Sequence, residues 1–435
     1  MIRRQHHSLY SLSISGVRWS FATTVSIMVV LLSFAAVGRA DAQTFTVLYS
    51  FQSPSDGDEP LSGVIRDGEG NLYGTTYDGG ASGYGIVFKI DKHDKETVLY
   101  SFAGGSDGAN PEGGLVRDAA GNLYGTTDGG GNPECGFGNY CGTVYKVDKN
   151  GNETVLYRFG SLPDGHSADS SLILDEDGNL YGTTEEGGDN GCNPGYGCGT
   201  VFKIDKAGRE IILHTFTGTR ELDGAFPLAG LVADANGYLY GTTSLGGAPT
   251  CISEQGRGFL RKVQKPSNTG GCGTIFRIDK QGKETILHRF SNYVAGASPD
   301  EPLILDNAGN LYGTAGGGSD YNGIVFTLDK HDRERVLYNF SYDEGYPAAG
   351  LVRDAEGNLY GLTNEGGTSY EGTVFKLDKS GALTILHGFS GTSDGGFPRG
   401  TLVMDEHGNV YGTARDGGIH NCGEYGCGVV FKITP

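Results

Sequence analysis

One short string recurs seven times along this chain of 435 residues and constrains its fold more than any other feature. The string GNLYGTT, with close variants, starts at seven glycines: Gly70, Gly121, Gly178, Gly237, Gly309, Gly357 and Gly408. Its tyrosines lie 48 to 72 residues apart. A repeat of this length indicates an array in which every copy is one supersecondary unit.

Each copy of the string belongs to a longer unit with four strand-like runs. In residues 96–148 these runs read ETVLYSF, GGLVRD, GNLYGTT and GTVYKVD. They are rich in β-branched and aromatic residues, which favour strands. Asp and Gly stand between the runs, and both residue types are typical of hairpin turns. We therefore predict one antiparallel four-stranded sheet per unit, which is the composition of a β-propeller blade.

The two ends of the repeat region are complementary fragments of one unit. Residues 44–51 read TFTVLYSF and match a fourth run, while residues 428–433 read GVVFKI and match a third run. Together they complete a seventh unit. The sequence thus predicts an all-β, seven-bladed β-propeller over residues 43–435, with four antiparallel strands per blade. We expect the N-terminal strand to close the ring by joining the C-terminal blade; an open β-solenoid is the alternative.

The first 42 residues differ from the repeats. Arginines precede an apolar run over residues 21–37, and a small-x-small site follows at residues 40–42. This pattern predicts a signal peptide over residues 1–42, cleaved before Gln43, with an uncleaved membrane anchor as the alternative. No later stretch is apolar for long enough to span a membrane. We expect an exported protein, either secreted and extracellular or periplasmic.

The charge of the chain bears on its partners. The formal net charge is −19, and residues 1–42 carry four Arg and one Asp, so the remainder is near −22. Such an acidic surface disfavours nucleic acid and anionic lipid as partners. It favours solubility, and we expect a monomer.

The eight cysteines lie in the four longest loops between second and third strands. They form four local pairs: Cys135 with Cys141, Cys192 with Cys198, Cys251 with Cys272, and Cys422 with Cys427. An even, pairwise set in an exported chain predicts four disulfides. Zinc binding is the alternative, although the spacings do not repeat a zinc-finger pattern.

The loops between second and third strands are the most variable part of the unit, ranging from 8 to 30 residues. Variable loops on a rigid scaffold commonly carry binding sites, so we predict that this end of the ring is the working face. The longest loop, residues 244–273, holds four neighbouring cations: Arg257, Arg261, Lys262 and Lys265. They predict a contact with an acidic ligand, such as a carboxylated glycan or an acidic partner surface; a solvated insertion is the alternative.

An Asp-Gly pair recurs in the connections between blades. The aspartates are Asp56, Asp107, Asp164, Asp223 and Asp394, and we expect them near the mouth of the pore. One interpretation is a turn in which Asp bonds backbone amides. The other is a ring of carboxylates that binds Ca²⁺. No EF-hand loop is present, and we predict no other cofactor or metal.

The fourth run carries an aromatic slot two residues before a recurrent Phe. The slot is filled by Tyr49, Tyr100, Tyr157, His214, His288, Tyr338 and His387. Because three histidines share a position with four tyrosines, we expect packing residues with a polar tip rather than metal ligands. We expect the Phe itself to pack between blades.

The whole unit, GGLVRD–GNLYGTT–GG–GTVFKID–ETVLYSF, resembles the GloVer tandem repeat of the "choice-of-anchor" exported bacterial proteins. The resemblance covers residues 44–433 and implies export. Many members carry a C-terminal sorting or anchoring segment, whereas this sequence stops at Thr434-Pro435, so the resemblance does not imply surface attachment here. It implies no activity and no catalytic residues.

The sequence contains no HExxH motif and no phosphate-binding loop. We therefore favour an exported binding or interaction module. Its expected ligand is an extracellular glycan or a cell-surface protein, bound on the face with the variable, disulfide-stapled loops. The alternatives are a propeller enzyme, a lyase or hydrolase with its site at the pore mouth, and a purely structural envelope protein.

Overall fold

The structure, a computed structural model, describes residues 43–434 with short gaps. The gaps are residues 134, 136–140, 193–194, 219–221, 249–250, 252–269, 419–421 and 423–424. The predicted signal peptide lies outside the described residues. Residues Thr44–Thr434 form one compact unit. In the described part of the chain, no helix is long and apolar enough to cross a membrane.

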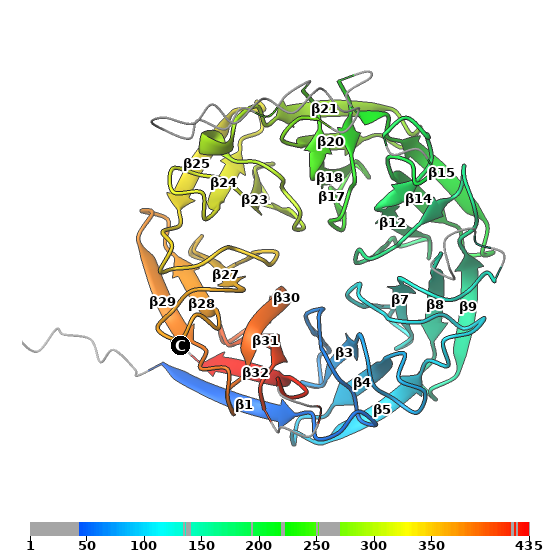
Figure 1. Ribbon diagram of the computed structural model, residues 1–435, viewed down its shortest axis with the longest axis vertical. Coiled ribbons are helices and arrows are strands. Elements are labelled where there is room, and N and C mark those ends of the chain that lie inside the picture. Colours follow the sequence, from blue (N-terminus) through cyan, green and yellow to red (C-terminus); the bar gives the residue numbers. More distant parts are fainter. Residues whose placement is uncertain are drawn as a thin grey trace, which may run out of the picture. The chain divides into compact units, whose positions relative to one another are not determined.

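Seven four-stranded antiparallel sheets are arranged as blades around a ring, as predicted (Figure 1). Blade 1 contains β2 (Ile65–Arg66), β3 (Leu72–Thr76), β4 (Ile86–Ile90) and β5 (Glu96–Ser101). Blade 2 contains β6 (Val116–Arg117), β7 (Leu123–Thr127), β8 (Thr143–Val147) and β9 (Glu153–Arg158). Blade 3 contains β11 (Ile173–Leu174), β12 (Leu180–Thr184), β14 (Thr200–Ile204) and β15 (Glu210–Thr215). Blade 4 contains β17 (Val232–Ala233), β18 (Leu239–Thr243), β20 (Thr274–Ile278) and β21 (Glu284–Arg289).

The remaining blades repeat this order. Blade 5 contains β22 (Ile304–Leu305), β23 (Leu311–Ala315), β24 (Ile324–Leu328) and β25 (Glu334–Asn339). Blade 6 contains β26 (Val352–Arg353), β27 (Leu359–Thr363), β28 (Thr373–Leu377) and β29 (Leu383–Gly388). Blade 7 contains β30 (Gly396–Met404), β31 (Val410–Asp416), β32 (Val429–Thr434) and β1 (Thr44–Ser50). The first strand of each blade is innermost and the fourth is outermost (Figure 1). A short 3-10 helix, η2 (Tyr293–Ala295), lies between blades 4 and 5.

The predicted ring closure is confirmed. Strand β1 pairs antiparallel with β32, from Thr44 opposite Thr434 to Ser50 opposite Val429. The N-terminal strand is therefore the outer strand of the last blade. Because the sheet order is β1-β32-β31-β30, no blade is left with an incomplete sheet.

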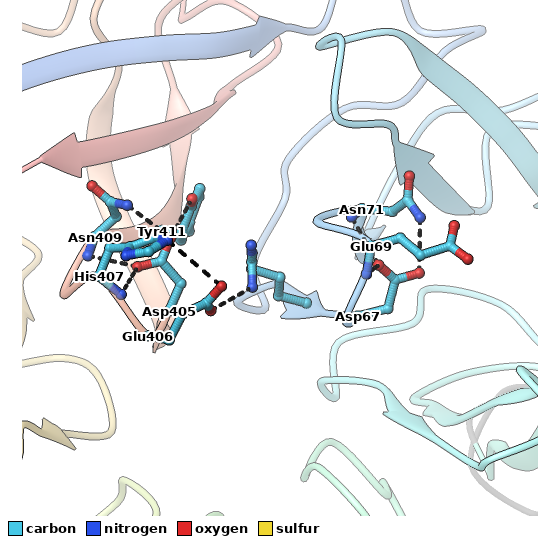
Figure 2. Close-up of polar contacts among 9 residues, drawn as sticks. Asp67, Glu69, Asn71, Asp405, Glu406, His407, Asn409 and Tyr411 are labelled. Carbon is cyan, nitrogen blue, oxygen red and sulfur yellow. Dashed lines mark hydrogen bonds and ion pairs between the residues drawn. The ribbon is translucent and has the colours of Figure 1, made fainter.

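The recurrent string builds the inner hairpin of each blade. In blade 1 the Asp67 carboxylate accepts hydrogen bonds from the backbone N–H of Asn71, from the Asn71 side chain and from the Tyr73 hydroxyl. Figure 2 shows this turn beside the matching turn of blade 7, which is built on Asp405. The tyrosine hydroxyl donates to the turn aspartate in all seven blades. Asp, Asn and Tyr therefore recur because they satisfy one another.

The glycine in the middle of the string leaves room for an aromatic ring. A Cβ added at Gly74 would lie 2.6 Å from Cζ of Phe88 in the neighbouring strand, closer than real Cβ contacts allow. That ring meets the fourth-strand Phe of the preceding blade, since Phe51 and Phe88 pack edge to face with centroids 5.2 Å apart. An equivalent pair recurs at every blade boundary, with Tyr145 as the third-strand ring in blade 2, and this confirms the predicted packing. Such pairs add stability beyond the area they bury.

The four predicted disulfides are confirmed: Cys135–Cys141, Cys192–Cys198, Cys251–Cys272 and Cys422–Cys427. The second cysteine of each pair is buried next to the start of the third strand. Each bridge fixes a long loop to the rigid sheet.

Candidate functional site

The blade connections and the variable loops lie at the same end of the ring. Strand β10 (Gly165–His166), in the connection to blade 3, pairs with β13 (Glu186–Gly187), which starts the loop between second and third strands. Strand β16 (Gly224–Ala225) pairs in the same way with β19 (Leu245–Gly246) in blade 4. We call this end the loop face. It is the end at which the sequence predicts the working surface.

A central cavity of about 590 Å³ opens within the ring, and all seven blades line it. Each blade contributes the residues that lead into its inner strand. In each blade a buried Leu or Val lies just before or within the inner strand, such as Val64 in blade 1, and the residue three positions before it lines the cavity. From blade 1 to blade 7 these lining residues are Leu61, Glu112, Asp169, Leu228, Asp300, Ala348 and Arg399. The repeats are thus nearly identical in their frame and different at the positions that face the cavity.

Carboxylates gather on the side of the cavity formed by blades 2 and 3. Burial raises the pKa of Asp169 well above its usual value, and the charges of Asp128, Glu112 and Glu185 raise it further. Burial likewise raises the pKa of Asp128, while a hydrogen bond with Asp169 opposes this rise. Both carboxyl groups therefore bind a proton more readily than an exposed Asp does.

The opposite side of the cavity combines acids with a cation. Burial raises the pKa of Asp300 to about 6, and burial together with the charge of Asp300 raises that of Glu301 to about 8. The Arg399 guanidinium lowers both values in part. Tyr346 and Asn364 of blade 6 also line the cavity. The site is therefore asymmetric, although the frame around it is sevenfold.

Exposed tyrosines lie in the loops of the loop face. In the described part of the chain, seven tyrosines are exposed: Tyr84, Tyr196, Tyr293, Tyr321, Tyr342, Tyr370 and Tyr425. All seven lie in the variable loops or in the blade connections. Two pairs are neighbours, with ring centroids 6.4 Å apart for Tyr293 and Tyr321 and 5.6 Å apart for Tyr342 and Tyr370. Exposed tyrosine is characteristic of binding surfaces because a rigid, amphipathic ring loses little entropy on contact.

The recurrent aspartates of the blade connections lie elsewhere than expected. Asp56 accepts hydrogen bonds from the Tyr49 hydroxyl of the outer strand β1 and from the backbone N–H of Gln52 and Ser53. Asp107, Asp164 and Asp394 are held in the same way, by the Tyr or His of an outer strand and by loop amides. Asp223 accepts hydrogen bonds from loop amides and lies 3.4 Å from Nε2 of His214. The expected position at the pore mouth is wrong, because each Asp comes directly after an outer strand. The bonds support the turn interpretation, and a role in ligand binding stays a prediction.

The aromatic slot of the outer strands packs as expected. His214 lies edge to face on Phe216 with centroids 4.7 Å apart, as Tyr49 does on Phe51 at 5.3 Å. The predicted cationic contact in the longest loop cannot be placed in the same way. Its four residues lie outside the described residues: Arg257, Arg261, Lys262 and Lys265.

The cavity residues and the exposed tyrosines were missed in the sequence, although both leave a signal. Aligning the seven units on the Leu or Val that leads into the inner strand shows a position that reads Leu, Glu, Asp, Leu, Asp, Ala and Arg. Similarly, Tyr stands one to three residues before the Gly that opens the third strand in six of the seven units. The cavity position stands out because it varies within an otherwise repeated segment. The tyrosine stands out because it recurs within loops whose sequences otherwise differ.

The fold and the site define a class: a closed, seven-bladed propeller repeat protein with one variable loop face around an asymmetric cavity. The sequence profile of the Gloeobacter/Verrucomicrobia repeat matches residues 38–253 and 250–435. The chain belongs to this repeat family. No curated protein sequence matches the chain.

Solved structures share the fold at low sequence identity. The extracellular domain of BT4673 from B. thetaiotaomicron, a proposed one-component system, is 11% identical with a TM-score of 0.54, over 90% of this chain and 40% of that chain. A luciferin-regenerating enzyme is 14% identical with a TM-score of 0.44, over 75% of this chain and 91% of that chain. A proposed oxidoreductase (glucose dehydrogenase) from Thermus thermophilus is 13% identical with a TM-score of 0.42, over 90% of this chain and 99% of that chain. The first likeness shows the propeller fold.

Proposed function

We propose that this protein is an exported binding module that recognises an extracellular glycan on its loop face. The observation that carries the proposal is the set of seven exposed tyrosines, all on that face. Sugar rings present C–H groups that stack on aromatic faces. Large, exposed aromatic residues gathered on one surface are typical of recognition sites.

The central cavity supports the same proposal and indicates which class of sugar it would accept. Sugar hydroxyls donate hydrogen bonds, and the cavity offers acceptors on Glu112, Asp169 and Asp300. Of the seven equivalent lining positions, three carry acids, namely Glu112, Asp169 and Asp300, and one carries a cation, Arg399. We therefore expect the cavity to prefer a neutral sugar or an amino sugar over an acidic one. A cell-surface protein is the other ligand class that an exposed tyrosine surface fits.

Export rests on separate observations. Four disulfides are typical of proteins that fold outside the reducing cytosol. The pattern over residues 1–42 predicts a signal peptide. Both support an extracellular or periplasmic location.

The test is binding of the purified protein to a panel of neutral, amino and acidic polysaccharides, read as a shift of the thermal midpoint and confirmed by calorimetry. A ligand that binds the native state raises the midpoint. Replacing Tyr342 and Tyr370 together by Ala should weaken binding by about tenfold or more, because stacked aromatic anchors dominate such contacts.

The matched control replaces Ile211 and Ile385 by Ala. Both are exposed apolar residues of outer strands, away from the loop face. The control should leave affinity unchanged. Equal loss in both double variants, or no binding to any polysaccharide, would refute the glycan proposal; binding to a cell-surface protein instead would favour the other ligand class.

A second candidate is a propeller hydrolase or lyase acting at the cavity, and one observation favours it. The pKa values of Asp128 and Asp169 are both raised, and neighbouring carboxyl groups in different protonation states can serve as general acid and base. The test is to incubate the protein with any polysaccharide that it binds and to look for new chain ends. Asp169→Asn should abolish cleavage while binding persists; intact polysaccharide after long incubation would exclude this candidate for that substrate.

A further inference from the structure

One of the outer-strand slots differs from the others in its chemistry. In four blades the slot holds a tyrosine, whose hydroxyl donates to an acid of the connection that follows. Tyr157 reaches a second acid as well: its hydroxyl is 2.9 Å from Asp164 of that connection and 3.4 Å from Glu210, which begins the outer strand of the next blade. Two neighbouring carboxylates are thus bridged by one phenol.

His214 occupies the same slot between blades 3 and 4 and keeps both acids. Its Nε2 atom lies 3.4 Å from Oδ2 of Asp223 and 3.8 Å from Oε2 of Glu284. Imidazole is shorter than phenol, so it does not reach either carboxylate as closely as Tyr157 does, and Nε2 is buried without a hydrogen-bond partner. A cavity of about 350 Å³ lies at these three side chains. Where Tyr157 bridges two acids through its hydroxyl, His214 leaves a space between its Nε2 atom and the carboxylate oxygens of Asp223 and Glu284.

The three donor atoms have the spacing of a first-row metal site. All lie within 4.8 Å of one another. Ligands held about 2.0–2.2 Å from a tetrahedral Zn²⁺ lie about 3.4 Å apart, so the observed distances need little closure. Asp223 is 7% exposed, and backbone N–H groups of Thr217 and Gly224 fix its carboxylate. Imidazole nitrogen favours Zn²⁺ over Ca²⁺, which takes oxygen ligands.

The other two histidine slots lack one part of this set. His387 contacts Asp394. The next outer strand is β1, which has Phe45 at the position where five other outer strands have Glu, and the Phe45 ring stacks on His387 with centroids 3.6 Å apart. His288 has Glu334 at the equivalent position of the next strand, but its connection lacks the Asp-Gly pair. Among the described residues, the slot of His214 is the place where histidine and both acids meet.

We propose that His214, Asp223 and Glu284 bind one Zn²⁺ or a similar first-row divalent cation, with water completing the coordination. The ion links the outer strands of blades 3 and 4, because β15 supplies the histidine and β21 supplies Glu284. Arg289 lines the same cavity, and its Nε atom donates to the carbonyl of Leu222. Its charge opposes the cation but leaves the two carboxylates in excess. The site would act as a metal staple between two blades and the connection that carries Asp223, which belongs to the loop face.

The test is a Zn²⁺ titration of the EDTA-treated protein by calorimetry, together with the thermal midpoint with and without Zn²⁺. The wild type should bind about one Zn²⁺ per chain and show a raised midpoint, since an ion that binds the native state stabilises it. His214→Tyr should fold, because Tyr fills the slot in four blades, and should weaken Zn²⁺ binding by more than about 100-fold, since it removes a ligand outright. His387→Tyr is the matched control and should bind like the wild type.

A gain variant tests the geometry directly. Tyr157→His places histidine between Asp164 and Glu210, and it should add a second equivalent of Zn²⁺. Unchanged Zn²⁺ binding in His214→Tyr would overturn the assignment. A single equivalent in Tyr157→His would overturn the claim that the slot with its two acids makes the site.

Discussion

At the scale of single residues, the turn aspartates hold the inner hairpins. Asp175 of blade 3 accepts from the Asn179 backbone at 2.8 Å, from the Asn179 side chain at 2.7 Å and from the Tyr181 hydroxyl at 3.0 Å. Burial raises the pKa of Asp175, but the hydrogen bonds from Asn179 and Tyr181 outweigh this effect and lower the pKa overall. The carboxylate is therefore stabilised in its charged form by the native fold.

The first prediction tests that carboxylate. Asp175→Ala removes the acceptor of three hydrogen bonds and should destabilise the protein by about 2–4 kcal/mol, because bonds to a charged group are worth about 1.5–3 kcal/mol each and part of this is recovered by water. Tyr181→Phe, which loses one of the three, should cost about 1 kcal/mol. Both are measured by urea unfolding. Equal effects of the two changes would contradict the central role of the aspartate.

At the scale of strands and blades, the packing of neighbouring strands requires a glycine, which has no side chain, beside a buried aromatic ring. Gly241 of β18 faces the ring of Phe276 in β20, and a Cβ would lie 2.5 Å from Cζ of that ring and 2.9 Å from Leu231. Phe276 in turn packs on Phe216 of the preceding blade. A shift of the ring would therefore disturb a blade boundary.

The second prediction follows from this contact. Gly241→Ala should destabilise the protein by about 1–3 kcal/mol through overpacking. Gly388→Ala in β29 is the control, since a Cβ there meets nothing within 4 Å. It should be neutral within about 0.5 kcal/mol. A thermal midpoint that falls equally in both variants would show that loss of glycine flexibility, rather than the ring, sets the effect.

At the scale of the whole molecule, acids with opposite pKa shifts shape the dependence of stability on pH. Burial, aided by neighbouring acids, raises the pKa of Asp58 to about 6, of Glu186 to about 7 and of Glu301 to about 8. These groups bind protons in the native state at a pH where the unfolded chain has released them. The turn aspartates do the reverse, because their pKa values are lowered.

The third prediction is the resulting pH profile. Where the native state binds more protons than the unfolded state, stability falls as pH rises. The thermal midpoint should therefore decrease from about pH 5 to about pH 8 as the buried acids ionise, and it should also decrease below about pH 4 as the turn aspartates are protonated. Glu301→Gln should reduce the slope on the alkaline side. A midpoint that rises between pH 5 and pH 8 would contradict the role of the buried acids.

The sequence predicts the parts of this molecule that depend on local order. The string with Asp, Gly, Asn and Tyr folds into one hairpin wherever it occurs, and the complementary ends imply the closed ring. The convergence of Asp128 with Asp169 depends on the radius and curvature of the ring, which the order of strands does not state. Asp56 lies away from its predicted position for a different reason. The connection runs from the outer strand to the inner strand across the whole blade, and Asp56 stands at its outer end, shortly after β1.

The closure of the ring has a mechanical consequence. Thr44 and Thr434 lie opposite each other at one end of the β1–β32 ladder, so a force that pulls these two residues apart opens this ladder like a zipper. A zipper breaks one hydrogen bond at a time, whereas strands pulled along their length resist with all bonds together. Tension between the two residues should therefore release β1 first and at low load, and single-molecule pulling would show this as a small early extension before any blade unravels. We therefore expect the ring to be mechanically weakest when force is applied between Thr44 and Thr434.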